Sequence, residues 1–319
     1  MAAALAAAPY GPGPYGPQGR SAWLDIDWSE RQRWVVVAGR PVDVCEIGPA
    51  DGQPIVWIHG LSGGWQNWLE NLPVFAAAGF RCIALDLPGF GHSPLPRERI
   101  TISGYAAIVD ELLQGLGIAA ACIVGNSMGG FIAAELAIRV PERVERLVLV
   151  SAAGLSVEEL RNDRAQALLE RMDFIVTAYA GWFASKSDLV ARRTRLRRAA
   201  FSFVAAYPEK LPAPLVAENL RGSGKPGFVH AVEALTTYPI RERLPEIACP
   251  TLIVWGARDH LVPVSDAYEF HRLIPDSRVV VYPQTGHVAM LERPIAFNAL
   301  LQAFMAEEPN VDVVQPSVG

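Results

Sequence analysis

The amino-acid sequence predicts an α/β fold, a mostly parallel eight-stranded sheet flanked by helices, with one helical insertion after the sixth strand. Two observations predict it. Short apolar runs rich in β-branched residues alternate with helix-like segments along most of the chain. That alternation stops between Ser156 and Arg243, where only helix-like segments occur, and resumes afterwards. A sheet interrupted by one helical cap accounts for both.

Eight segments have the composition of strands: residues 34–37, 42–47, 55–58, 81–85, 121–124, 147–150, 252–255 and 279–282. Helices are predicted at 102–116 and 131–139, and a glycine or a proline ends each of them. Within the insertion we expect helices over 157–180 and 189–206. The order of these segments sets the expected topology.

The predicted organisation has five parts: a disordered leader (1–20), a core in two pieces (21–155 and 244–308), a helical cap or lid (156–243) and a disordered tail (309–319). The leader is predicted to be disordered because a Pro/Gly/Tyr repeat dominates it. The tail scatters valines among polar residues and prolines, which gives too little apolar surface for a core.

The composition favours a soluble enzyme. Apolar residues make up 51% of the 319, enough for a large core, and a net charge of −5 gives no electrostatic reason to expect a nucleic-acid partner. No apolar run approaches the ~18 residues of a membrane span. Four cysteines lie in or beside apolar runs without metal-ligand spacing, so we expect free thiols and a cytoplasmic location: Cys45, Cys82, Cys122 and Cys249.

Residues 125–129, Gly-Asn-Ser-Met-Gly, form the most informative motif of the chain. A strand-like run precedes them and a helix-like run follows. A serine at the tip of so sharp a turn strains its backbone, and glycine two positions to either side relieves the crowding. The turn also places the Ser127 hydroxyl at a helix N-terminus, where N–H groups stabilise a negative oxygen. We therefore interpret Ser127 as a nucleophile.

A serine nucleophile needs a base, and the base needs a group that orients it. His287 follows the last strand-like run on a loop from which an imidazole can reach Ser127. Asp259 follows the strand-like run 252–255, whereas the preceding strand ends without a carboxylate. The resulting chain order of serine, aspartate and histidine is one of the known orders of this triad. His260 adjoins Asp259 too closely to be oriented by it and reach the serine.

Three other residues could compete for these roles: His59, His92 and Asp86. His59 begins a turn after a strand, and a structural hydrogen bond to loop backbone fits it better. The same holds for His92 in its Gly/Pro-rich loop. Asp86 ends a strand and is followed closely by proline and glycine, which favours a turn of the Asx type.

These motifs resemble those of the α/β-hydrolase family, and the resemblance extends from about residue 34 to about residue 305. The His-Gly turn at 59–60 resembles the family's oxyanion turn, and residues 86–93 resemble its D-x-P-G-x-G-x-S loop. The resemblance implies that the backbone N–H groups of Leu61 and Met128 receive an oxyanion. We expect neither a cofactor nor a metal.

The resemblance also implies a function: a serine hydrolase, like a carboxylesterase or monoacylglycerol lipase, that cleaves small-molecule carboxylic esters through an acyl-enzyme. An alternative is a C–C bond hydrolase of aromatic meta-cleavage products, whose nucleophile turn the pentapeptide also resembles. Members of that group carry a tryptophan after the base, where this chain has Val288, and residues 290–294 look more like the esterase branch. A third possibility is a ligand-binding protein on a retained hydrolase fold, against which the complete triad argues.

Candidate residues for a substrate pocket come from two places. Trp182 and Phe203 are aromatic residues of the predicted cap, which would roof Ser127. Val262 and Val288 lie on the loops that carry the acid and the base. An apolar pocket built from either pair would set which acyl chains are accepted.

Overall fold

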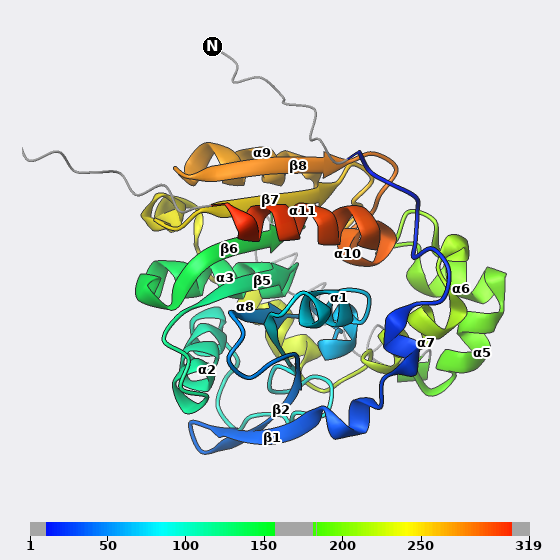
Figure 1. Cartoon of the computed structure of the whole chain (residues 1–319), viewed down its shortest axis with the longest axis horizontal. Coiled ribbons are helices and arrows are strands. Elements are labelled where there is room, and N and C mark those ends of the chain that lie inside the picture. Colours follow the sequence, from blue (N-terminus) through cyan, green and yellow to red (C-terminus); the bar gives the residue numbers. More distant parts are fainter. Residues whose placement is uncertain (1–10, 157–180, 183, 308–319) are drawn as a thin grey trace, which may run out of the picture.

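Eight strands form a single sheet in the order β1-β2-β4-β3-β5-β6-β7-β8 (Figure 1). The structure, a computed structural model, describes residues 11–156, 181–182 and 184–307. The strands are β1 Gln32–Val37, β2 Arg40–Ile47, β3 Pro54–Ile58, β4 Arg81–Leu85, β5 Ala121–Asn126, β6 Val144–Val150, β7 Thr251–Gly256 and β8 Ser277–Tyr282. Each contains one of the eight predicted segments, so the predicted fold class is confirmed.

β2 pairs antiparallel with both β1 and β4, and every other neighbouring pair is parallel. In β5 all six residues are buried, as is typical of a parallel strand that helices cover on both faces. Because parallel strands end at the same edge of a sheet, the loops after β3, β5, β7 and β8 gather at one edge.

In the described part of the chain, helices and short 3₁₀ segments lie before, between and after the strands. The helices are α1 Leu72–Ala77, α2 Ile102–Gly115, α3 Met128–Arg139, α5 Ser187–Arg192, α6 Thr194–Phe201, α7 Ala213–Arg221, α8 Phe228–Thr237, α9 Val264–Leu273, α10 Ala289–Glu292 and α11 Pro294–Ala306. The 3₁₀ segments are Ala22–Asp25, Trp28–Glu30, Trp65–Trp68, Pro141–Arg143, Pro208–Lys210 and Arg241–Glu246.

The sheet separates two apolar clusters, because successive side chains of a strand point to opposite faces. In β3, Val56 and Ile58 join the cluster that contains buried residues of α2, α3 and α9. Ile55 and Trp57 join the other cluster, which contains buried residues of α1, α10 and α11. The core is therefore a three-layer arrangement of helices, sheet and helices, and it fixes the strand ends that carry the candidate site.

The helices α5, α6, α7 and α8 all lie between β6 and β7, the place predicted for the cap. Figure 1 shows α5, α6 and α7 grouped at one side of the sheet. The helix expected over 189–206 is instead two helices, because Arg193 is extended (φ −102°, ψ 107°). Val190 on α5 and Phe201 on α6 are both buried. The helix expected over 157–180 and the tail over 309–319 lie outside the described residues.

From residue 11 onward, the expectation of a disordered leader is wrong. The Gly16 N–H donates to the Glu292 carbonyl at 2.7 Å, and the Tyr15 hydroxyl donates to the Glu292 carboxylate at 2.7 Å. The repeat is rich in proline and glycine, but its tyrosine finds a partly buried partner, which composition alone does not reveal.

Two smaller expectations can be checked in the described part of the chain. All four cysteines are free, three of them buried and Cys249 half-buried, as predicted. Among the described helices, none combines the length and the apolar character needed to cross a membrane.

Candidate active site

Ser127 occupies the single position between β5 and α3. Its backbone (φ 56°, ψ −118°) lies in the strained region that side chains rarely adopt. The flanking glycines explain how the turn fits. A β-carbon at Gly125 would lie 2.2 Å from the Gly129 carbonyl oxygen, and one at Gly129 would lie 2.2 Å from the Ile58 carbonyl oxygen. Neither position has room for a side chain. Because glycine occupies both, the turn can form with a serine at its tip.

Ser127 is partly exposed, and its hydroxyl makes no hydrogen bond with any described residue. Its main chain, in contrast, is fixed, because the Ser127 N–H donates to the Val150 carbonyl at 2.9 Å. A rigid backbone that presents a free hydroxyl suits a nucleophile, and such hydroxyls often form their catalytic hydrogen bonds only when substrate is bound.

Two backbone N–H groups belong to residues next to the serine turn: Met128 follows Ser127 in the chain, and Leu61 follows a glycine that packs against Ser127. Met128 is the first residue of α3, so its N–H has no acceptor within the helix. Leu61 follows Gly60, at which a β-carbon would lie 3.0 Å from the β-carbon of Ser127. In the described part of the protein, neither the Leu61 nor the Met128 N–H donates a backbone hydrogen bond.

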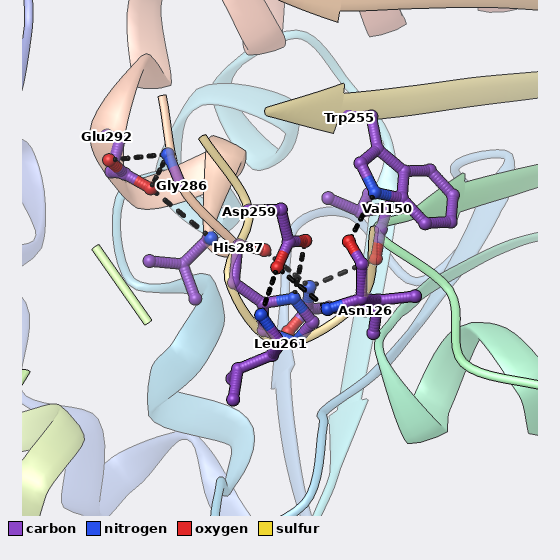
Figure 2. A network of polar contacts seen from close by, with 10 residues as sticks. Asn126, Val150, Trp255, Asp259, Leu261, Gly286, His287 and Glu292 are labelled. Atoms are coloured by element: carbon purple, nitrogen blue, oxygen red, sulfur yellow. Dashed lines mark hydrogen bonds and ion pairs between the residues drawn. The ribbon is translucent and has the colours of Figure 1, made fainter. Parts of the chain in front are cut away.

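Asp259 and His287 are paired. The His287 Nδ1 lies 2.7 Å from an Asp259 carboxylate oxygen, and their side chains are 0% and 5% exposed, aspartate first (Figure 2). The other Asp259 oxygen accepts the N–H groups of Leu261 and Val262, each at 2.9 Å. With its proton on Nδ1, the imidazole keeps Nε2 free to accept another.

Opposing effects act on the pKa of Asp259. Burial alone would raise it, but the hydrogen bond and charge of His287, with the N–H groups of Val262 and Leu261, outweigh burial and hold the pKa below its usual range. Asp259 is therefore ionised near neutral pH, as a group that orients an imidazole and balances an imidazolium must be.

Asn126 connects the serine turn to the histidine loop. Its side-chain N–H₂ donates to the Val150 carbonyl at 3.0 Å and to the His287 carbonyl at 3.2 Å (Figure 2). Asn126 is 3% exposed, so both bonds are shielded from water. Sequence reasoning assigned Asn126 no role, although its place beside the serine was the signal that could have found it.

Glu292 holds the other side of the histidine loop. Its carboxylate accepts the Gly286 N–H at 2.9 Å and the Val288 N–H at 3.4 Å, and the residue is fully buried (Figure 2). Burial raises the pKa of Glu292, while hydrogen bonds from Gly286 and its other donors act in the opposite direction. A carboxylate in a buried, apolar stretch five residues after the candidate base was a signal that the sequence analysis did not use.

His59 and His92 have structural partners, as expected, whereas Asp86 binds N–H groups of Trp65 and His92 instead of forming the expected Asx-type turn. The His59 Nδ1 lies 2.7 Å from the Gly60 carbonyl oxygen, and its Nε2 accepts the Leu87 N–H at 3.0 Å. Burial lowers the pKa of His59 to about 4, so it is neutral near pH 7. Asp86 accepts the backbone N–H groups of Trp65 and His92, each at 2.8 Å, and burial raises its pKa to about 6.

Asp43, Asp86 and His92 bring their ligand atoms within 4.8 Å of one another, the one such cluster of potential metal ligands in the described residues. The His92 Nδ1 already lies 2.9 Å from an Asp43 oxygen, and both Asp86 oxygens accept backbone N–H groups. These internal bonds order the loop after β4.

The four pocket candidates differ in exposure. Val262 and Val288 are 4% and 7% exposed and belong to the loops of Asp259 and His287. Trp182 and Phe203 are 49% and 69% exposed. The two valines are therefore packed beside the acid and the base, whereas both aromatic side chains face solvent over much of their surface.

Comparisons with known proteins identify the family of the chain. A family model for the alpha/beta hydrolase fold matches residues 53–294, which contain β3 to β8 and the serine, aspartate and histidine. Two relatives of known name are similar over most of the chain. One is a 2-hydroxy-6-oxo-6-phenylhexa-2,4-dienoate hydrolase of Burkholderia cepacia, 30% identical over 80% of this chain and 88% of its own.

The second relative is the dihydrolipoyllysine-residue acetyltransferase component of an acetoin cleaving system from Pseudomonas putida. It is 31% identical over 84% of this chain and 68% of its own length. Among solved structures, that of a bacterial membrane phospholipase A is 28% identical with a TM-score of 0.66, over 89% of this chain and 90% of that one. Similarity of fold and sequence thus spans proteins with different named activities.

Proposed function

The chain belongs to the α/β-hydrolase fold family, and we propose that it is a serine hydrolase that cleaves carboxylic esters through an acyl-enzyme intermediate. The observation that carries the proposal is the free hydroxyl of the partly exposed Ser127 at the start of α3, two unpaired N–H groups in residues next to the serine turn, and a histidine already oriented by a buried aspartate. These are the parts that acyl transfer to a serine requires.

In the first half of the proposed reaction, His287 Nε2 takes the Ser127 proton as the hydroxyl oxygen attacks the ester carbonyl carbon. Asp259 holds the imidazole with its proton on Nδ1 and stabilises the imidazolium that forms. The Leu61 and Met128 N–H groups receive the oxyanion, and removal of one such donor costs about 3–4 kcal/mol of transition-state stabilisation. His287 then protonates the leaving alcohol.

In the second half, His287 removes a proton from water as the water attacks the acyl carbon of the Ser127 ester. The serine oxygen leaves as the tetrahedral intermediate collapses, and it recovers the proton from His287. The products are a carboxylic acid and the free enzyme. The described free thiols support a reducing compartment such as the cytoplasm as the place of this activity.

A specific observation favours a second candidate, the hydrolysis of a C–C bond in aromatic meta-cleavage products. The Burkholderia cepacia relative carries the name of such an enzyme, at 30% identity and over most of both chains. A phospholipase A is by its name an enzyme that cleaves esters, so the similarity to such a structure supports the first candidate instead. Val288 after the base, where the C–C hydrolases carry tryptophan, also favours the ester.

One panel separates the two candidates. The enzyme is assayed with p-nitrophenyl esters from acetate to palmitate beside 2-hydroxy-6-oxo-6-phenylhexa-2,4-dienoate, with Ser127→Ala as the blank. We expect a higher kcat/KM for the best ester than for the dienoate, and no ester hydrolysis in Ser127→Ala. A higher kcat/KM for the dienoate would favour the C–C hydrolase. Turnover of neither class, by a folded protein, would contradict the proposal.

A further inference from the structure

The Glu292 carboxylate joins three segments that lie far apart in the sequence. From the histidine loop it accepts the Gly286 N–H, from the cap it accepts the Ala206 N–H at 2.8 Å, and from the N-terminal segment it accepts the Tyr15 hydroxyl at 2.7 Å. Because the residue is fully buried, each donor helps to compensate the loss of water around a charged group. Each donor therefore also fixes where the carboxylate lies.

The cap and the histidine loop touch through their main chains. The His287 N–H donates to the Val204 carbonyl at 2.8 Å. A β-carbon at Gly286 would lie 2.8 Å from the Ala206 nitrogen and 3.0 Å from the Val204 oxygen, so only glycine permits this approach. The main chain of the candidate base is thus held by the cap on one side and by Glu292 on the other.

The Tyr15 hydroxyl takes part in this arrangement both as a hydrogen-bond donor and as an acceptor. The hydroxyl donates to Glu292 and accepts the Tyr207 N–H at 2.9 Å, directly after the cap residues that contact the loop. Its ring meets the Tyr207 ring edge-on at 5.5 Å, and the Arg293 guanidinium lies 5.0 Å from its centre. Burial, with the charge of Glu292, raises the pKa of Tyr15, so the phenol remains a donor.

Other bonds hold the segment that carries Tyr15. An Arg293 guanidinium nitrogen donates to the Gly13 carbonyl at 2.9 Å, and the Gly16 N–H donates to the Glu292 carbonyl at 2.7 Å. Residues on both sides of Tyr15 are therefore attached to Glu292, the last residue of α10, and to Arg293, the N-cap of α11. The N-terminal segment is placed by Glu292, the residue that also binds the histidine loop.

We propose that Tyr15 is a positioning residue for the candidate base: its hydroxyl, shared between the Glu292 carboxylate and the Tyr207 N–H, fixes the carboxylate against the backbone of the His287 loop. The proposal rests on the function proposed above, since it assigns Tyr15 a part in the placing of His287. A displacement of about 1 Å in a catalytic group can lower a rate by up to ~100-fold. A hydroxyl remote from the substrate can therefore affect turnover.

The test begins with Tyr15→Phe, which keeps the ring contacts and removes only the hydroxyl. On the preferred ester we expect kcat to fall about ten-fold while KM stays within about two-fold, because the base is displaced and the pocket is not. Tyr268→Phe is the matched control, since Tyr268 is half exposed on α9. The control should keep wild-type kcat and KM. Unchanged kcat in Tyr15→Phe would overturn the proposal.

A second measurement does not depend on turnover. Hydrogen exchange followed by mass spectrometry should show faster exchange in the peptide that contains Gly286, His287 and Val288 in Tyr15→Phe, and no change there in Tyr268→Phe. Unchanged exchange in that loop would overturn the proposal even if kcat fell. If the wild-type protein turned over no substrate of the panel, the proposed function would fail and the exchange data alone would decide.

A double-mutant cycle with Glu292→Gln tests whether the two residues act through one contact. The fold-losses in kcat of Tyr15→Phe and Glu292→Gln should not multiply in the double variant, because each removes the same support from the loop. Losses that multiply would mean that Tyr15 acts independently of Glu292, and they would overturn the proposed route.

Discussion

The Asn126 side chain reaches across from the nucleophile turn to the main chain of His287, at 3.2 Å from its carbonyl oxygen. The same N–H₂ group donates to the Val150 carbonyl at the end of β6. The loops after β5, β6 and β8 are therefore joined by one buried side chain. This bond sets the distance between the candidate nucleophile and the candidate base independently of any bond between their side chains.

Asn126→Leu should therefore lower kcat and also stability. The substitution keeps the volume but leaves the buried His287 carbonyl without a donor, whereas the Val150 carbonyl still accepts the Ser127 N–H. A buried acceptor without a donor costs about 1–3 kcal/mol in the free energy of unfolding. We expect kcat to fall about ten-fold as the histidine loop shifts. The control is Asn298→Leu, because Asn298 in α11 is also buried and its side-chain N–H₂ donates to the Glu70 carbonyl. Urea unfolding should show losses in both variants, and only Asn126→Leu should lose kcat; equal kcat in the two would contradict the assignment.

Ser127→Gly should make the protein more stable and inactive. At φ 56° and ψ −118° a serine is strained, by about 1–3 kcal/mol for such a conformation, and glycine relieves that strain. Its greater entropy in the unfolded chain offsets part of the gain. We expect a higher midpoint of thermal unfolding for Ser127→Gly than for Ser127→Ala, with neither variant active. A lower midpoint for the glycine variant would mean that the turn stores no strain.

Asp259→Asn should remove both activity and an acid-dependent part of the stability. The wrong imidazole tautomer would lower kcat by up to ~10⁴. The folded-state pKa of Asp259 is held below its unfolded value of about 4, so its contribution to stability is present above pH ~4 and is lost as the pH falls through the folded pKa. The stability difference between wild type and Asp259→Asn should shrink as the pH falls below ~4 in urea titrations.

The pH dependence of the stability that Asp86 contributes has the opposite sign to that of Asp259, and Asp86→Asn removes it. Burial raises the pKa of Asp86 to about 6, so the folded state binds its proton more tightly than the unfolded state does. The stabilising effect of that proton is present below the unfolded value of about 4 and is lost as the pH rises to about 6. If Asp86→Asn proved the more damaging to kcat at equal folded yield, Asp259 would not be the orienting acid.

Val288→Ala should change which acyl chains are preferred. Val288 is 7% exposed beside the candidate base, and its loss should shift the preference along the p-nitrophenyl series by about 1–3 kcal/mol, the scale of a methylene or two in an apolar pocket. Phe203→Ala should shift it less, because Phe203 is 69% exposed. A larger shift in Phe203→Ala would assign the pocket to the cap instead.

Much of the fold could be predicted because local signals and tertiary structure agree. The run before Ser127 is apolar and β-branched, and all six residues of β5 are buried as such a run predicts. Asp259 and His287 are predictable because each follows a strand, and the parallel pairing of β7 and β8 brings the two loops together. Residues that follow parallel strands lie at the same edge of the sheet, so such pairs can be predicted from the sequence.

The rest depended on contacts that leave no periodic pattern. Tyr15 lies in a Pro/Gly/Tyr repeat whose composition suggests disorder, yet its hydroxyl binds a carboxylate 277 positions away. Glu292 looks like an ordinary charge on a short helix until the donors around it are known. The break at Arg193 falls where the sequence has neither a glycine nor a proline, so no local stop signal predicts it.

Trapping of the acyl-enzyme tests the proposed function most directly. The enzyme is quenched with acid during turnover of p-nitrophenyl butyrate, digested and analysed by mass spectrometry. The account predicts that the peptide containing Ser127 gains one butyryl group, that Asp259→Asn slows formation of this adduct, and that Ser127→Ala abolishes it together with turnover, a loss of up to ~10⁶ in kcat. Butyryl found on another residue, or turnover that persists in folded Ser127→Ala, would contradict the account.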